Sequence, residues 1–210
     1  MLEKIKKYFP HILLGLYLVE FIYFAINPVD RSVWWAENIP VFTAVLVLVL
    51  TFKKFRFSNL TYFLMGFFLM YHTYGGHYTF ELAPFGFVNH ILDKFDFSLM
   101  QAGRNNFDRV GHYMVGFFAL PLMEITYKTG VIKKKWVAIL FGVFALGFWG
   151  SLYEIIEMLY AVKEGGSAGA AFLGSQGDIW DAQKDMALDI LGALTMAVLF
   201  WFWKIKKIEK

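Results

Sequence analysis

Cysteine is absent from the sequence, and charged side chains are scarce in it. Without thiols the chain forms no disulfide, zinc-thiolate site or iron–sulfur cluster, so any metal must be held by His, Asp or Glu. Charged residues make up 18% of the chain, against roughly 25% in a typical soluble domain, while 58% of residues are hydrophobic. Long apolar runs alternate with short charged segments. We therefore predict an all-α integral membrane protein whose single domain spans residues 1–210.

Six apolar runs predict about six transmembrane helices, because each approaches the ~20 residues that cross a bilayer. Two of the runs are short, and residues 33–37 and 75–78 lengthen them. The result is a polytopic membrane helix bundle. The runs cover residues 8–26, 39–52, 60–74, 112–127, 136–159 and 186–203.

Basic residues are distributed unevenly between the two sides of this predicted bundle. One side, which includes both chain ends, carries fourteen of the twenty Lys and Arg residues. Basic loops resist translocation, so we predict that both termini are cytoplasmic and that the chain crosses the membrane several times. The net charge of +3 has the same origin, and we expect the lipid bilayer and no nucleic acid as partner. The fourteen residues are Lys4, Lys6, Lys7, Lys53, Lys54, Arg56, Lys128, Lys133, Lys134, Lys135, Lys204, Lys206, Lys207 and Lys210.

Acidic and histidine residues gather at the predicted outer ends of four helices. A helix rises ~1.5 Å per residue, which brings these positions to one level of the bilayer. Several are spaced three or four residues apart and therefore share a helix face, as inward-facing metal ligands of helix bundles do. The residues concerned are His77, Asp108, His112, Glu154, Glu157, Asp181, Asp185 and Asp189.

These groups favour a functional site, because a charge at the bilayer centre costs ~2.5–3.5 kcal/mol even on a lenient scale. Clustered carboxylates repel one another unless they are protonated, paired with Arg104 or Arg109, or neutralised by a cation. Our hypothesis is a divalent ion, Zn, Mn or Mg. We predict Glu157 and Asp181 as catalytic residues, and His77, Asp108, His112, Glu154, Asp185 and Asp189 as metal ligands.

Simpler interpretations exist for several of these residues. Asp108 alone suits a helix N-cap. Asp178 and Asp181 are also compatible with a solvated loop face, and His72 with a hydrogen-bonded core histidine. These alternatives require no ligand.

Four sequence strings resemble the YjdF-like family of bacterial inner-membrane proteins: GGHYTF (75–80), DRVGHY (108–113), YEIIE (153–157) and FLGSQGDIWDAQKDM (172–186). They occur in the same order, and the resemblance covers most of the chain. The resemblance implies an inner-membrane location and does not imply an activity.

A second resemblance is to the VanZ-like membrane proteins, which are associated with tolerance to glycopeptide antibiotics. Their pattern is D-[KR]-x-x-H, then E-x-x-Q, then D-x-x-x-N-x-x-G. The chain matches it from Asp108 to His112, at Glu154, and from Asp185 to Gly192. It departs at Glu157 and Asp189, where Gln and Asn are usual, and both departures add a carboxylate.

Two classes of function fit this pattern. The first is a metal-dependent hydrolase or transferase that acts on a lipid or cell-envelope precursor, because a bound metal activates water and polarises phosphoryl or acyl oxygens. The second is a cation or proton-coupled transporter or binding protein, in which the same carboxylates hold the transported ion. A non-catalytic membrane partner subunit is a further alternative.

Overall fold

The computed structural model describes residues 2–94, 99–100, 103–173 and 175–205, and these form helices and loops without any strand. The all-α prediction is therefore confirmed for the described residues. The helices group into two compact units, residues 1–85 and 86–210. The single membrane domain over residues 1–210 stays a prediction.

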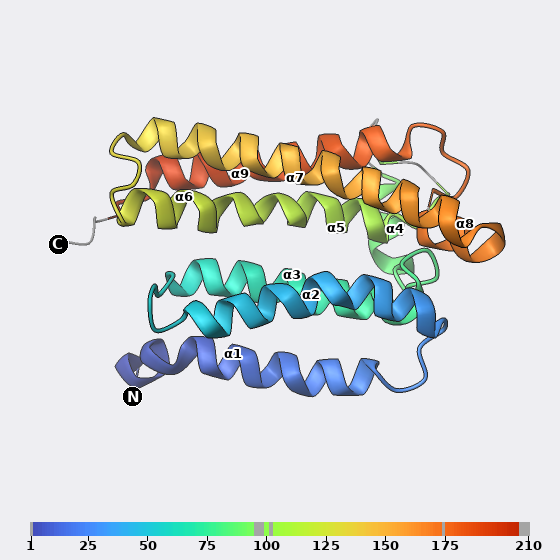
Figure 1. The fold of residues 1–210 in the computed structure, drawn as a ribbon, viewed down its shortest axis with the longest axis horizontal. Coiled ribbons are helices and arrows are strands. Elements are labelled where there is room, and N and C mark those ends of the chain that lie inside the picture. Colours follow the sequence, from blue (N-terminus) through green and yellow to red (C-terminus); the bar gives the residue numbers. More distant parts are fainter. Residues whose placement is uncertain (1, 95–98, 101–102, 174, 206–210) are drawn as a thin grey trace. The chain divides into compact units, whose positions relative to one another are not determined.

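Unit 1 is a three-helix bundle of α1 (Leu2–Phe24), α2 (Arg31–Thr51) and α3 (Asn59–Tyr78) (Figure 1). Helix α3 packs against both α1 and α2. Side-chain caps begin two of the helices, since Asp30 accepts hydrogen bonds from the backbone N–H groups of Val33 and Ser32, and Ser58 accepts one from that of Thr61. The bond from Val33, with those from Ser32, lowers the pKa of Asp30.

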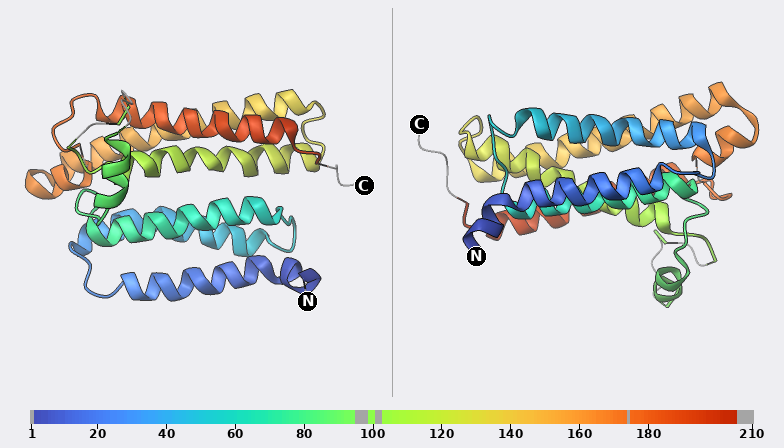
Figure 2. Two further views of the ribbon diagram at one scale, coloured as in Figure 1. Left: turned by 180° about the vertical axis from the view of Figure 1, so that it is seen from behind. Right: turned by 90° about the horizontal axis from the view of Figure 1, so that it is seen from below.

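Unit 2 contains a longer bundle and two short helices (Figure 2). Helix α9 is its centre, because it packs against α7, α5, α6 and the 3-10 turn η1. The short helix α8 packs against α7. The elements are α4 (Gly86–Leu92), α5 (Phe107–Val115), η1 (Gly116–Phe118), α6 (Ala119–Lys128), α7 (Lys135–Glu164), α8 (Gly166–Leu173) and α9 (Asp181–Phe202).

Helices occupy all six predicted apolar runs, with one interruption. By length and composition, α2, α7 and α9 are able to cross a membrane. The fourth run is divided by η1 into α5 and α6, whereas α1 and α3 are continuous over 23 and 20 residues. Three membrane-capable helices are therefore established among the described residues. The count of six spans and the cytoplasmic termini stay predictions.

Candidate functional site

One face of α9 carries three buried aspartates. Asp181, Asp185 and Asp189 follow one another at four-residue intervals, and they are 8%, 2% and 1% exposed. The spacing had predicted a common face, and the burial confirms it. Buried carboxylates need compensating groups, so the role of this face depends on the side chains that neighbouring helices place against it.

Glycines allow α9 to approach its neighbours closely enough for these aspartates to meet partners. A Cβ added at Gly192 would overlap the backbone oxygen of Tyr113 on α5, and one added at Gly116 would lie 2.5 Å from the backbone oxygen of Asp189. On α7, a Cβ added at Gly150 would overlap the Asp189 carboxylate. Small residues at helix crossings commonly permit such contacts in membrane bundles.

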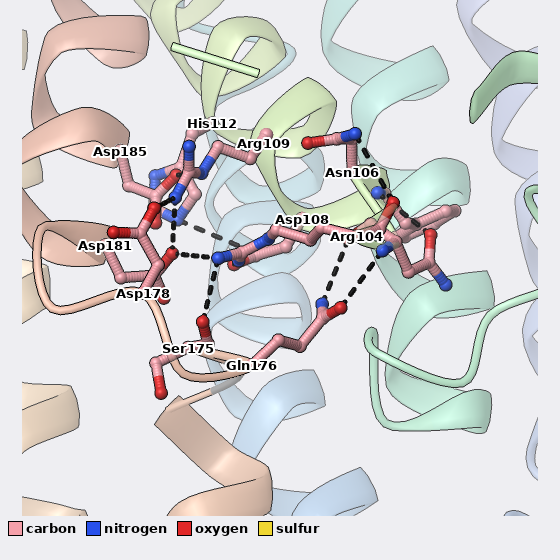
Figure 3. Close-up of polar contacts among 12 residues, drawn as sticks. Arg104, Asn106, Asp108, Arg109, His112, Ser175, Gln176, Asp178, Asp181 and Asp185 are labelled. Carbon is pink, nitrogen blue, oxygen red and sulfur yellow. Dashed lines mark hydrogen bonds and ion pairs between the residues drawn. The ribbon is translucent and has the colours of Figure 1, made fainter. Parts of the chain in front are cut away.

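An ion-pair network, which we call the arginine clamp, joins the start of α5 to the start of α9 (Figure 3). Its members are Arg104, Arg109, Asp178, Asp181 and Lys184. Arg104 contacts Asp181 at 2.5 Å, while Arg109 contacts Asp178 at 2.7 Å and Asp181 at 2.8 Å. Lys184 contacts Asp178 at 2.6 Å. Three cations thus engage two carboxylates, and Arg109 is fully buried.

Further hydrogen bonds attach the loop before α9 to the clamp. Arg104 donates to the carbonyl oxygen of Ser175 at 2.9 Å. The side-chain amide of Gln176 accepts a hydrogen bond of 3.0 Å from the backbone N–H of Asn105 and donates one of 3.0 Å to its carbonyl oxygen. The Lys184 ammonium, together with the Arg109 guanidinium and the backbone N–H of Trp180, holds the pKa of Asp178 well below its usual range. The loop is therefore fixed by charged side chains.

Next to the clamp lies a second group, which we call the carboxylate–histidine cluster: Asp108, His112, Glu154, Asp185 and Asp189. His112 Nδ1 lies 3.2 Å from Asp189, and its Nε2 lies 3.7 Å from Asp108 and 3.8 Å from Glu154. One ligand atom each of Asp108, His112 and Asp185 lies within 4.8 Å of the other two. Helices α5, α7 and α9 all contribute.

Three buried oxygens of this cluster accept no hydrogen bond: Glu154 Oε1, Asp185 Oδ1 and Asp189 Oδ2. Asp185 Oδ1 lies 3.3 Å from Nε of Arg109, an ion-pair contact without a hydrogen bond. Buried polar atoms are normally satisfied, so several unsatisfied oxygens around one imidazole indicate room for a further cationic or proton-donating partner.

Five of the six predicted metal ligands meet in the cluster. The sixth, His77, belongs to unit 1, at the end of α3, and its Nδ1 lies 2.9 Å from the carbonyl oxygen of Phe24. Its role as a ligand stays a prediction.

The two predicted catalytic residues lie beside the cluster. Glu157 is half-buried, one turn beyond Glu154 on α7. Asp181 is a member of the arginine clamp, so two guanidiniums fix its carboxylate. The catalytic roles of both residues stay predictions.

The simpler interpretations have different outcomes. Asp108 is not the N-cap, since α5 begins at Phe107 and Asn106 precedes it. Asp178 is not part of a solvated face either, because its side chain is 6% exposed and ion-paired. His72 is a core histidine as expected, with Nε2 3.1 Å from the carbonyl oxygen of Glu37. No sequence pattern points to Lys184, because its role depends on the loop that brings Asp178 within 2.6 Å of its ammonium group.

The helices and their buried polar groups define an all-helical membrane protein with a charged cluster inside one bundle. A family model described as "Predicted membrane protein (DUF2238)" matches residues 9–206. The chain is 34% identical over 179 residues to "Inner membrane protein YjdF" of Escherichia coli (strain K12), which covers 84% of this chain and 81% of that protein. The chain therefore belongs to the DUF2238 family, and the YjdF-like resemblance is confirmed. No solved structure matches it.

Proposed function

We propose that this chain is a multi-pass protein of the bacterial inner membrane whose carboxylate–histidine cluster binds a divalent cation near the outer face. The observation that carries the proposal is the grouping of Asp108, His112 and Asp185, whose ligand atoms lie within 4.8 Å of one another. Glu154 and Asp189 complete the cluster, and both touch the same imidazole.

The charge balance supports a cation. Four carboxylates surround one histidine. Two arginines lie beside them, Arg104 at 4.0 Å from Asp108 and Arg109 at 3.3 Å from Asp185, but both guanidiniums also hold carboxylates of the clamp. Uncompensated buried charge costs several kcal/mol per ion, so a divalent cation would relieve most of the repulsion.

The donor set also suits a metal. One imidazole with carboxylates is a common set for Zn and Mn, and Mg is the choice if carboxylates dominate. Two ligand atoms each ~2.1 Å from one metal are at most ~4.2 Å apart. Binding therefore requires small inward rotations of side chains that lie up to 4.8 Å apart.

Metal analysis of the purified full-length protein tests this proposal. We expect about one ion per chain in the parent and at least tenfold less in Asp185→Asn, which keeps the side-chain shape. Glu124→Gln is the matched control, because Glu124 is another fully buried carboxylate in unit 2 but pairs with Lys128. A chelator should lower the unfolding temperature of the parent and of the control, since a ligand at 100 times its Kd adds about 2.7 kcal/mol. Chelator-insensitive melting of a metal-free parent would contradict the proposal.

A metal-dependent hydrolase or transferase acting on a lipid or cell-envelope precursor is the second candidate. Asp108 favours it, because its side chain is 19% exposed while those of Asp185 and Asp189 are at most 3% exposed. One side of the cluster is therefore accessible, as a catalytic metal with an open ligand position requires. Glu157, which is half-buried one turn beyond Glu154 on α7, is the proposed general base, with Asp181 as the alternative.

Phosphate release from a lipid-linked diphosphate in vesicles separates this candidate from cation transport. For the enzyme, Glu157→Gln should retain the metal and lose ~100-fold or more of the turnover, the range that a general base contributes. For a transporter, vesicles containing the protein should accumulate the cation without phosphate release. A partner subunit would do neither.

A further inference from the structure

Unit 1 contains a cavity of about 160 Å³ between its three helices. Its walls come from about two turns of each helix: residues 10–17 of α1, residues 45–49 of α2 with Phe52 directly after that helix, and residues 62–69 of α3. At ~1.5 Å per residue each stretch is about 10 Å long, so the cavity is a slot that follows the helix axes. Gly66 widens it, because a Cβ there would lie 2.5 Å from the end of the Leu13 side chain.

The lining of this slot is hydrocarbon apart from His11, Tyr17 and Tyr62. A cavity of ~150 Å³ lined by aliphatic and aromatic side chains stays dry and accepts apolar molecules. The lining therefore selects a hydrocarbon group over water or an ion. A slot parallel to the helices of a membrane protein is oriented as a lipid acyl chain would be.

One end of the slot meets a basic surface, the basic patch, formed by Lys7, Lys53, Lys54 and Arg56. Phe52 joins the two, since its ring lies 5.0 Å from that of His11 in the slot and 5.6 Å from the Arg56 guanidinium. Arg56 also donates a hydrogen bond of 2.5 Å to the carbonyl oxygen of Lys7, which holds α1 beside the α2–α3 turn. All four basic residues are exposed, and residues 4–11 and 51–62 contain no Asp or Glu.

We propose that unit 1 binds an anionic phospholipid, with a segment of one acyl chain in the slot and the phosphate on the basic patch. Basic segments next to membrane helices attract anionic lipids electrostatically. A hydrocarbon slot and an adjacent basic surface match the two parts of such a lipid. The site is independent of the cation cluster in unit 2.

Native mass spectrometry of the full-length protein with dioleoyl phosphatidylglycerol or dioleoyl phosphatidylcholine tests the proposal. We expect the parent to retain one phosphatidylglycerol at least fivefold better than phosphatidylcholine. Leu48→Phe fills the slot and should reduce retention of both lipids at least fivefold. Leu46→Phe is its matched control, because Leu46 lies on the same helix, is 57% exposed and does not line the slot.

Charge variants test the headgroup half without altering the slot. Lys53→Gln combined with Lys54→Gln should abolish the preference for phosphatidylglycerol and leave phosphatidylcholine retention unchanged. Lys133→Gln combined with Lys134→Gln, in unit 2, should keep the preference. Equal retention of the two lipids by the parent would overturn the proposal, as would equal retention by the Leu48→Phe and Leu46→Phe variants. If Leu48→Phe does not fold, Gly66→Ala replaces it, because Gly66 lines the slot and the added methyl group would displace the Leu13 side chain, which lines it too.

Discussion

Arg109 connects the two polar groups of unit 2. Its Nη2 contacts Asp178 and Asp181 in the arginine clamp, while its Nε lies 3.3 Å from Asp185 in the carboxylate–histidine cluster. A guanidinium suits this position because its planar fork serves several carboxylates and it remains charged when buried. Arg109 thus offers a fixed positive charge at the edge of the cluster, as Arg104 does 4.0 Å from Asp108, and the proposed cation supplies the rest.

Asp178 provides a pH test at the residue scale. Its pKa lies well below the usual range, so its ion pairs stabilise the fold above the unfolded pKa of about 4 and are lost as the pH falls toward the lower folded pKa. We expect Asp178→Asn to unfold about 2–4 °C below the parent at pH 7, the shift that 1 kcal/mol gives in a chain of this size. This difference should shrink below pH ~4.

Melting curves of both proteins between pH 7 and pH 3 measure the effect. Asp93→Asn is the control, because Asp93 is exposed in the loop after α4. A difference between Asp178→Asn and the parent that stays constant down to pH 3 would contradict the assigned ion pairs.

At the scale of elements, the contact between α7 and α9 depends on glycines of α7, which have no side chain. Gly150 faces the carboxylate of Asp189, and Gly147, nearly one turn earlier, faces Ile190 with an ordinary contact of 3.6 Å for an added Cβ. The two glycines lie on one helix but differ in what surrounds them. Alanine substitutions at the two positions therefore distinguish the effect of helix propensity on stability from the effect of crowding the Asp189 carboxylate.

Gly150→Ala should displace the Asp189 carboxylate from His112 and lower the unfolding temperature. If the parent binds metal as proposed, Gly150→Ala should also reduce its metal content severalfold. Gly147→Ala should be neutral or stabilise the protein by up to about 1 kcal/mol, the usual gain of Ala over Gly within a helix. Thermal unfolding and metal analysis of both variants provide the comparison, and equal behaviour would argue against the close approach at Gly150.

At the scale of the whole molecule, the orientation in the membrane decides which compartment the cluster serves. The prediction rests on the excess of Lys and Arg on one side of the apolar runs. If that side is cytoplasmic, the α7–α8 connection near Gly165 and the clamp belong to the outer side of the membrane.

Reporter fusions test the orientation directly. Fusions after Tyr127 and after Trp203 should both report a cytoplasmic location, and a fusion at Gly165 should report an outer one. Alkaline phosphatase and a fluorescent protein serve as complementary reporters, because each is active on one side only. The reverse pattern would place the cluster toward the cytosol and exclude a cell-envelope substrate at the outer face.

The sequence by itself determined the helical class, the positions of the apolar helices and the common face of Asp181, Asp185 and Asp189. These are local properties, because hydropathy and a period of 3.6 residues act within one helix. The sequence also predicted His112, Glu154 and Asp189 as ligands of one metal site, because helical rise brings them to a shared level in the bilayer.

Only the tertiary structure decided which partner each charged group has. The sequence offered metal, protonation or arginine as compensation for the carboxylates. The structure gives Asp178 and Asp181 to Arg104, Arg109 and Lys184, and leaves oxygens of Glu154, Asp185 and Asp189 without hydrogen bonds. The physical reason is that pairing across helices depends on axial approach and side-chain direction. Both are set here by glycine contacts between residues about 40 to 80 positions apart, which no local pattern encodes.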